Sequence, residues 1–217
     1  MIQTVIFDLD GVIIDSEPIN FRLEEELFQE IGLSMPLNEH HSYVGTSSIN
    51  MWQTIVKKYT LPYNPKELEE TGKDRYLQYL SLHPEISPIE GVRELIKELY
   101  QQQFTLVLAS SSGTEIIDTV LNSFDLGSYF MAKISGADLP FSKPDPEIFL
   151  RSAQLAQTDS SQCLVIEDSE NGVKAAKAAG MKCIGYLNPN SGNQNLDKAD
   201  LVIRSFHEIN INRIRNI

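Results

Sequence analysis

Short runs of apolar residues alternate along most of the chain with longer segments whose apolar residues recur at helical spacing. The short runs cover residues 4–7, 105–109, 163–166, 183–186 and 201–203. Apolar and polar residues do not alternate within them, which is typical of strands buried on both faces of a parallel sheet. Because strands that alternate with helices form βαβ units, the pattern predicts an α/β fold with a Rossmann-like, doubly wound parallel sheet.

Helix start and stop patterns accompany the segments between the apolar runs. Ser112 and Glu115 form a capping-box pattern ahead of the apolar residues at 116–121. Residues 169–179 predict another helix, which the following Gly180 would close. Both helices are expected to connect strands of the sheet.

Residues 16–85 break this alternation, because they contain no convincing strand. Three apolar stripes at helical spacing lie there, at positions 19–31, 51–59 and 64–80. We therefore expect an α/β core, made of residues 1–15 and 86–217, and a helical segment of residues 16–85 that is inserted after the first strand.

Composition narrows the classes of partner and the compartment. The 217 residues include 18 basic and 30 acidic ones, and the net charge of −12 argues against nucleic acids and anionic membranes as partners. No apolar stretch approaches the roughly 20 residues of a membrane span, and the first residues do not form a signal peptide. Cys163 and Cys183 lie in apolar runs, as buried thiols in a reducing compartment do. We therefore expect a cytoplasmic protein, whose oligomeric state the sequence leaves open.

Two pairs of acidic residues follow two of the apolar runs. Asp8 and Asp10 come after the first run. Glu167 and Asp168 follow the run that ends at residue 166. Each pair alone is also typical of a solvated turn or a helix cap. Ligands of open α/β sheets bind beyond the carboxyl ends of the strands, so four carboxylates would converge there, which favours a divalent cation, and Mg²⁺ fits best.

The residue types of the Asp8–Asp10 pair leave three roles open, namely nucleophile, general acid and base, and metal ligand.

Further polar groups follow other strands. Ser110 and Ser111 precede a helix, where hydroxyls and backbone N–H groups form either an anion-binding loop or a simple serine cap. Lys143 stands before a proline that stiffens its loop, although a single lysine is more often solvated. Together these groups are the ones that phosphoryl transfer needs.

The order of these motifs resembles that of the haloacid dehalogenase-like hydrolase superfamily, in the branch of the β-phosphoglucomutases and phosphoglycolate phosphatases. The resemblance covers nearly the whole chain and rests on the segments 7–12, 108–112, 142–147 and 166–176. It implies that residues 16–85 form an α-helical cap domain over the site. The acid at position 10 implies phosphatase or phosphomutase chemistry, because the dehalogenases of this superfamily lack it.

The resemblance also implies roles for the reacting groups. Asp8 would be the nucleophile that forms an aspartyl-phosphate. Asp10 would protonate the leaving oxygen and then activate water. The Ser110 hydroxyl and the Ser111 N–H would hold the phosphoryl group, and Lys143 would bridge that group and Asp8.

A Mg²⁺ site is implied by the same resemblance. Asp8 would bind the ion through its second oxygen, and Asp10 would bind it through its backbone carbonyl. Asp168 would be a further ligand. Glu167 would bind the ion directly or through water.

Substrate choice is expected to depend on the cap, where the chain departs from the mutases. Gly45, Ser47 and Ser48 cover the stretch in which the mutases carry an arginine for a second phosphate, and Ser48 stands at that point. Gly72 stands at the place of a mutase lysine, although Lys73 is adjacent. Because a bisphosphate needs a cation at both ends, the sequence favours a phosphatase of a small phosphorylated metabolite such as a sugar phosphate.

Two alternatives stay open at this point. One is a β-phosphoglucomutase-type enzyme that interconverts glucose 1-phosphate and glucose 6-phosphate. The other is a signalling receiver that accepts a phosphoryl group on an aspartate, although the helical insert and Asp10 argue against it.

Overall fold

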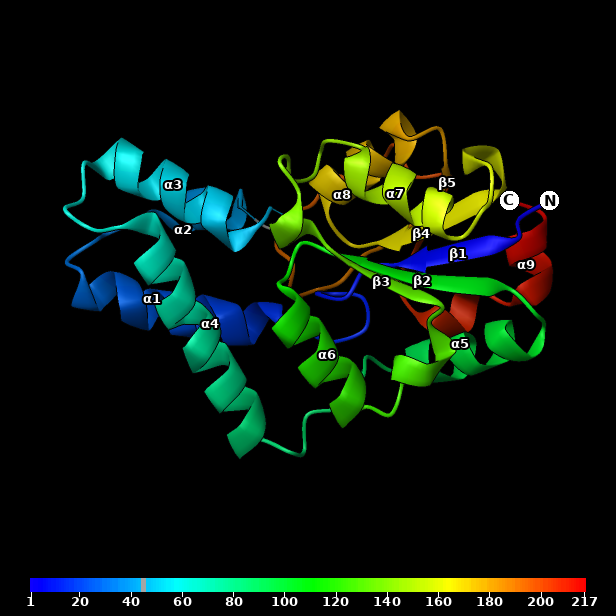
Figure 1. Ribbon diagram of the computed structural model, residues 1–217, viewed down its shortest axis with the longest axis horizontal. Helices are drawn as coiled ribbons and strands as arrows, with labels where there is room; N and C mark the ends of the chain where they lie inside the picture. Colours follow the sequence, from blue (N-terminus) through cyan, green and yellow to red (C-terminus); the bar gives the residue numbers. More distant parts are fainter. Residues whose placement is uncertain (44–45) are drawn as a thin grey trace.

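A parallel six-stranded sheet forms the centre of the computed structural model, which describes residues 1–43 and 46–217 (Figure 1). The strand order is β3-β2-β1-β4-β5-β6. The strands are β1 (Thr4–Phe7), β2 (Thr105–Ser110), β3 (Ala132–Ser135), β4 (Cys163–Glu167), β5 (Lys182–Tyr186) and β6 (Leu201–Ile203). The α/β class and the five strands expected from apolar runs are confirmed.

Helices cover both faces of this sheet, as Figure 1 shows. Successive side chains of a strand point to opposite faces: Val5 and Phe7 pack into one apolar cluster and Ile6 into the other. The first cluster includes residues of α5 (Val92–Gln101), α6 (Thr114–Ser123) and α9 (Ile211–Arg215). The second includes residues of α7 (Glu147–Leu155) and α8 (Glu170–Ala178). The sheet is therefore doubly wound, as predicted.

Four helices lie between β1 and α5 and stand beside the carboxyl ends of the strands (Figure 1). They are α1 (Glu17–Glu30), α2 (Leu37–His41), α3 (Ser48–Tyr59) and α4 (Pro65–Leu82). They share an apolar cluster of their own, which includes Phe28, Trp52 and Leu68. The division of the chain at residues 16 and 85 into two domains stays a prediction.

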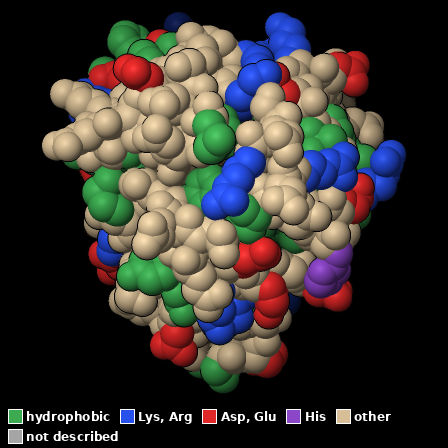
Figure 2. Space-filling view, turned by 90° about the vertical axis from the view of Figure 1, so that its right-hand side faces the viewer, with side chains coloured by type: hydrophobic (Ala, Val, Ile, Leu, Met, Phe, Trp, Pro, Cys, Tyr) green, Lys and Arg blue, Asp and Glu red, His purple; other side chains and the backbone are tan. Residues whose placement is uncertain are grey.

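Short 3₁₀ helices complete the connections: η1 (Gly127–Tyr129), η2 (Gly136–Asp138), η3 (Ser160–Gln162) and η4 (Phe206–Glu208). Both chain ends lie at the far end of the sheet from α1–α4 (Figure 1). On the face turned toward the viewer in Figure 2, acidic and basic side chains are interspersed and hydrophobic ones form separate small patches. Within the described residues, no helix combines the length and apolar character that a bilayer crossing requires.

The order of the strands fixes where a ligand can bind. From β1 the chain adds β2 and β3 on one side and then returns to place β4 on the other side of β1. In open α/β sheets, the crevice at such a reversal is the usual binding site, outside the carboxyl ends of the strands. The two acidic pairs lie at this end of the sheet: Asp8 and Asp10 follow β1, while Glu167 ends β4 and Asp168 follows it.

Two expectations from the sequence differ from the structure. Strand β3 has no continuous apolar run, because it lies at the edge of the sheet and its exposed Lys133 pairs with Asp118. The capping box of Ser112 and Glu115 is wrong, since α6 has Gly113 at its N-cap without a side-chain bond. The Ser112 hydroxyl instead donates a hydrogen bond to Asp10.

Candidate active site

A buried ammonium lies between two carboxylates at the ends of β1 and β4. Lys143 donates from Nζ to Oδ1 of Asp8 at 2.7 Å and to Oε1 of Glu167 at 2.6 Å. The side chains of Lys143, Asp8 and Glu167 are 1%, 8% and 0% exposed. Phe7 pairs with Ile166 in the sheet, so the residues that follow the two strands meet. The structure therefore brings three of the candidate residues into one dry cluster.

The cluster holds more negative than positive charge. Burial raises the pKa of Asp8 to about 8, although Lys143 opposes the shift. Burial and the neighbouring Glu167 carboxylate raise the pKa of Asp168 well above its usual value. Burial alone would lower the pKa of Lys143, but the two adjacent carboxylates raise it, so the ammonium stays charged. One ammonium does not balance the carboxylates, and a further cation would offset their repulsion.

The carboxylates of Asp8, Glu167 and Asp168 lie close enough together for one metal ion to bind all three. Each offers one oxygen, and these atoms lie within 4.8 Å of one another. A Cβ at Gly11, where φ is +72°, would lie 2.0 Å from Oδ2 of Asp168. A Cβ at Gly172 would lie 1.8 Å from Oε1 of Glu167. The two glycines thus let the main chain approach the carboxylates closely, and the oxygen set fits a hard divalent cation such as Mg²⁺.

Hydroxyl groups hold two of these carboxylates in place. Ser169 donates to Oε2 of Glu167 from both its N–H and its Oγ, at 2.9 Å each. Ser191 donates from its hydroxyl to Oδ2 of Asp168. Second partners of this kind orient the side chains that bind a metal. Ser191 lies in an irregular segment far along the chain, where no sequence pattern marks it as a partner of Asp168.

Asp10 is fixed by three serine hydroxyls. Ser16 donates to its Oδ1 at 2.7 Å, while Ser112 and Ser110 donate to its Oδ2 at 2.7 Å and 3.2 Å. The Ser110 Oγ also accepts from the N–H of Ser112 at 2.9 Å. A carboxylate held by donors on both oxygens keeps one orientation, which suits a group that must exchange a proton with a bound molecule.

The three consecutive serines at the end of β2 and just after it differ in their surroundings. Ser110 is fully buried behind Asp10, whereas Ser111 and Ser112 line a cavity. The loop leads into α6, whose N-terminal N–H groups favour an anion. Ser112 is therefore a site residue that the sequence analysis assigned to a helix cap.

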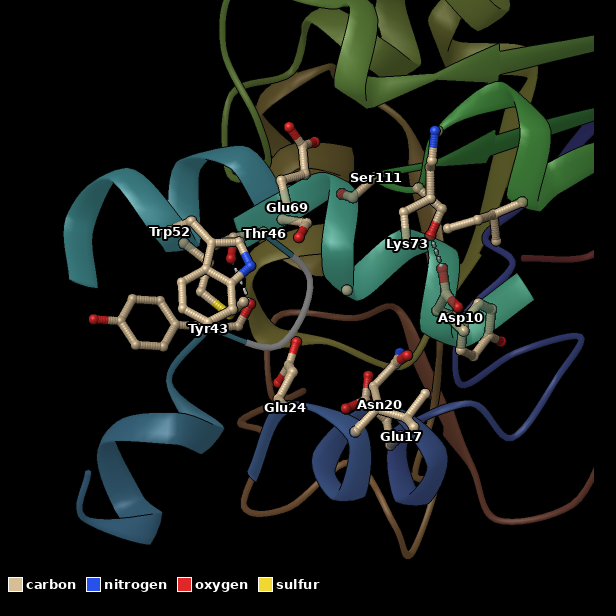
Figure 3. Close-up of a pocket in the computed structure, with 18 of the residues that line it drawn as sticks. Asp10, Glu17, Asn20, Glu24, Tyr43, Thr46, Trp52, Glu69, Lys73 and Ser111 are labelled. Carbon is tan, nitrogen blue, oxygen red and sulfur yellow. Dashed lines mark hydrogen bonds between the residues drawn. The ribbon is translucent and has the colours of Figure 1, made fainter. Parts of the chain in front are cut away.

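The cavity of about 190 Å³ lies between the sheet edge and α1, α3 and α4 (Figure 3). Ser48 and Gly72, two positions at which the chain was expected to differ from the mutases, line it together with the adjacent Lys73. Ser47 is buried at the N-cap of α3. Gly45 lies outside the described residues.

Acidic side chains also line the part of the cavity next to the helices. Figure 3 shows Glu17 and Glu24 rising from α1, with Glu69 on α4. Glu24 contacts His40, which is only 4% exposed. Trp52 is both buried and part of the lining.

Known proteins resemble this chain in both sequence and fold. The profile of the haloacid dehalogenase-like hydrolases matches residues 5–186. Hexitol phosphatase B of Escherichia coli K12 is 32% identical over 96% of this chain and 94% of its own. The phosphorylated carbohydrates phosphatase of Thermotoga maritima is 29% identical over 84% of this chain and 83% of its own. The crystal structure of β-phosphoglucomutase from Clostridium difficile, 27% identical, matches with a TM-score of 0.86 over 100% of this chain and 96% of that one.

Proposed function

Because this chain belongs to the haloacid dehalogenase-like hydrolases, we propose that it is a Mg²⁺-dependent phosphatase that cleaves a small sugar or polyol phosphate through an aspartyl-phosphate. One observation carries the proposal, namely the buried Lys143 between Asp8 and Glu167 with Asp168 beside them. The names of the hexitol and carbohydrate phosphatases support a phosphorylated sugar or polyol as the substrate.

Asp8 and Asp10 divide the chemistry between them. A carboxylate oxygen of Asp8 forms a bond to phosphorus as the bond to the ester oxygen breaks, and Asp10 gives its proton to that oxygen, so the alcohol leaves. Water then attacks the aspartyl-phosphate while Asp10 takes its proton. Phosphate leaves, and the Asp8 carboxylate is restored.

The neighbouring groups hold and neutralise the phosphoryl oxygens. Lys143, already 2.7 Å from Asp8, supplies a fixed positive charge next to the reacting bond. The N-terminus of α6 and the Ser111 segment supply hydrogen-bond donors. Asp8, Glu167 and Asp168 would hold Mg²⁺, with the backbone carbonyl of Asp10, and the ion supplies charge neutralisation for the transferring group.

Residues 16–85 would serve as a cap that excludes bulk water. Two side-chain contacts link these helices to the rest of the chain: Asn50 of α3 donates to the Ser142 hydroxyl at 2.8 Å, and the Nζ of Lys73 of α4 lies 3.3 Å from Oε2 of Glu115 of α6. Both contacts hold the helices against the sheet, and closure of this kind keeps water away from the intermediate.

The similarity to the C. difficile enzyme keeps a phosphomutase as the second candidate. Its test is a coupled assay for glucose 6-phosphate from β-glucose 1-phosphate with a bisphosphate primer. Isomerisation that outpaces phosphate release would replace the phosphatase proposal.

A screen of phosphorylated metabolites tests the phosphatase itself. We expect phosphate release with Mg²⁺, none with EDTA, and none from Asp8→Asn in either condition. Turnover by Asp8→Asn would refute the aspartyl-phosphate route.

A further inference from the structure

One side of α1 presents polar side chains to the cavity, beside the apolar Phe21, Leu23 and Leu27 of the same helix. Glu17, Asn20 and Glu24 follow one another at spacings of three and four residues, so they lie along one side of the helix. All three line the cavity, and Figure 3 shows them side by side on α1. We call these three residues the α1 polar face.

Glu17 is buried without a partner. It is 9% exposed, and no side chain of residues 1–43 or 46–217 forms a hydrogen bond or an ion pair with its carboxyl group. Burial raises its pKa to about 8, with further contributions from Asp10 and Glu24. A buried polar group without a partner is costly, so this carboxyl group is suited to a hydrogen bond with a molecule that enters the cavity.

Glu24 is held by a buried imidazole. The Nε2 of His40 contacts Oε2 of Glu24. The imidazole ring is packed between Phe21 and Phe28, with ring-centre distances of 4.1 Å and 5.0 Å. His40 therefore fixes the direction of the Glu24 carboxylate, whose side chain is 26% exposed.

The part of the cavity next to the α1 polar face offers little positive charge. Lys73 is the one lysine or arginine among the lining residues that the structure describes, and it already pairs with Glu115 at 3.3 Å. Glu69 adds a further carboxylate on α4. A second phosphate or carboxylate of a bound molecule would face Glu24 and Glu69 without a free cation, which is unfavourable.

We propose that the α1 polar face binds the hydroxyl groups of the substrate and makes the enzyme selective for polyhydroxylated monophosphates that carry no second anionic group. This inference rests on the proposed phosphatase function. It assigns the specificity to Glu17, Asn20 and Glu24, each of which can accept a hydrogen bond from a hydroxyl.

The first experiment compares kcat/KM for defined substrates with Mg²⁺ present. Sorbitol 6-phosphate and glucose 6-phosphate carry only hydroxyl or carbonyl-derived groups beyond the phosphate, whereas 6-phosphogluconate and fructose 1,6-bisphosphate carry a second anion. We expect a preference of about tenfold or more for the first pair. Comparable values for the two pairs would overturn the proposal. A clear preference for glucosamine 6-phosphate over glucose 6-phosphate would also overturn it, because it would assign the face to an ammonium.

The second experiment uses Glu17→Gln and Glu24→Gln, with phenyl phosphate as a substrate that lacks hydroxyl groups. We expect each variant to lower kcat/KM for sorbitol 6-phosphate about fivefold or more, and we expect Glu24→Gln also to discriminate less against 6-phosphogluconate. The value for phenyl phosphate should fall less than the value for sorbitol 6-phosphate, because phenyl phosphate makes no such hydrogen bond. Equal losses for both substrates would show a merely structural role and overturn the proposal.

Glu25→Gln is the matched control, since Glu25 is an exposed carboxylate on the same helix outside the cavity lining. It should leave both substrates unchanged. A wild-type protein that hydrolyses neither phenyl phosphate nor any sugar phosphate with Mg²⁺ would refute the proposed function and this inference with it. Hydrolysis without discrimination would refute the inference alone.

Discussion

The Nζ of Lys143 donates to Oδ1 of Asp8 at 2.7 Å inside a cluster that is almost closed to water. The two groups come from distant parts of the sequence: Asp8 directly follows β1, while Lys143 lies in the loop between η2 and α7. The ion pair therefore matters both for the proposed chemistry and for the stability of the folded site.

Replacing Lys143 by methionine should lower both the activity and the stability of the protein. Without the ammonium, the Asp8 and Glu167 carboxylates face each other unpaired, and loss of one partner from a buried ion pair costs about 3–5 kcal/mol. We expect kcat to fall about 100-fold or more. We also expect the free energy of unfolding to fall more in EDTA than in Mg²⁺, because the ion offsets the same charges. Urea denaturation in both conditions measures this, with the exposed Lys66→Met as the control. Identical losses with and without Mg²⁺ would contradict the assigned metal ligands.

Gly172→Ala should weaken metal binding without removing a ligand. Its Cβ would lie 1.8 Å from Oε1 of Glu167, so the carboxylate must move. Displaced ligands and their supporting groups change metal affinity by about 10–100-fold. We expect a matching rise in the Mg²⁺ concentration needed for half-maximal activity, and a matching loss of affinity by calorimetry.

Gly127→Ala is the control for that experiment, because its nearest neighbour, Asn122 Oδ1, would lie 3.7 Å from the new Cβ. An unchanged Mg²⁺ requirement in Gly172→Ala would show that Glu167 does not contribute to the metal site.

Asp10→Asn should affect substrates according to their leaving groups. An alkoxide needs a proton as it leaves, whereas p-nitrophenolate leaves without one. We expect kcat to fall about 100-fold or more for sorbitol 6-phosphate. With p-nitrophenyl phosphate, we expect a burst of one nitrophenolate per enzyme, because the aspartyl-phosphate forms but water is no longer activated. Rapid-quench kinetics would detect the burst, and equal slowing of both substrates without a burst would refute the assigned role.

Glu17 should make stability depend on pH. Its pKa is raised from 4.5 to about 8 by burial. Between these values the folded state holds a proton that the unfolded chain has lost. The free energy of unfolding therefore falls as pH rises through this range, by up to about 1.4 kcal/mol per pH unit for one group. Glu17→Gln should flatten the fall between about pH 5 and pH 8 in urea denaturation with EDTA. Asp8 adds a slope of the same sign, which stays in the variant.

The exposed Glu25→Gln should keep the full slope of the wild type. If Glu17→Gln retains that slope as well, the Glu17 carboxyl group is ionised in the folded protein, contrary to its burial.

The sequence was sufficient to predict that the acidic groups at the ends of β1 and β4 lie close together. The apolar runs mark buried parallel strands, and such strands bring Asp8, Asp10, Glu167 and Asp168 to one edge of the sheet. Their catalytic and metal-binding roles stay predictions. Strand β3 escaped prediction because an edge strand alternates polar and apolar residues as many loops do.

The cavity lining next to α1 and α2 could not be predicted from the sequence, for a different reason. The run Glu24-Glu25-Glu26 is typical of a solvated helix face, and only the packing of α2 against α1 shows that Glu24 meets His40 while Glu25 stays exposed. Helical spacing tells which residues share a side of a helix. It does not tell which side faces another element.

The register of β1 has a consequence for how the enzyme becomes active during folding. Thr4 pairs with Thr105 on one side and with Cys163 on the other, so the central strand has no neighbour that is close in sequence. Contacts of such long sequence separation form late and slowly, because large loops must close first. Asp8 and Glu167 become adjacent only when β4 docks beside β1. Regained activity after denaturation will therefore follow this long-range docking step rather than the earlier formation of helices.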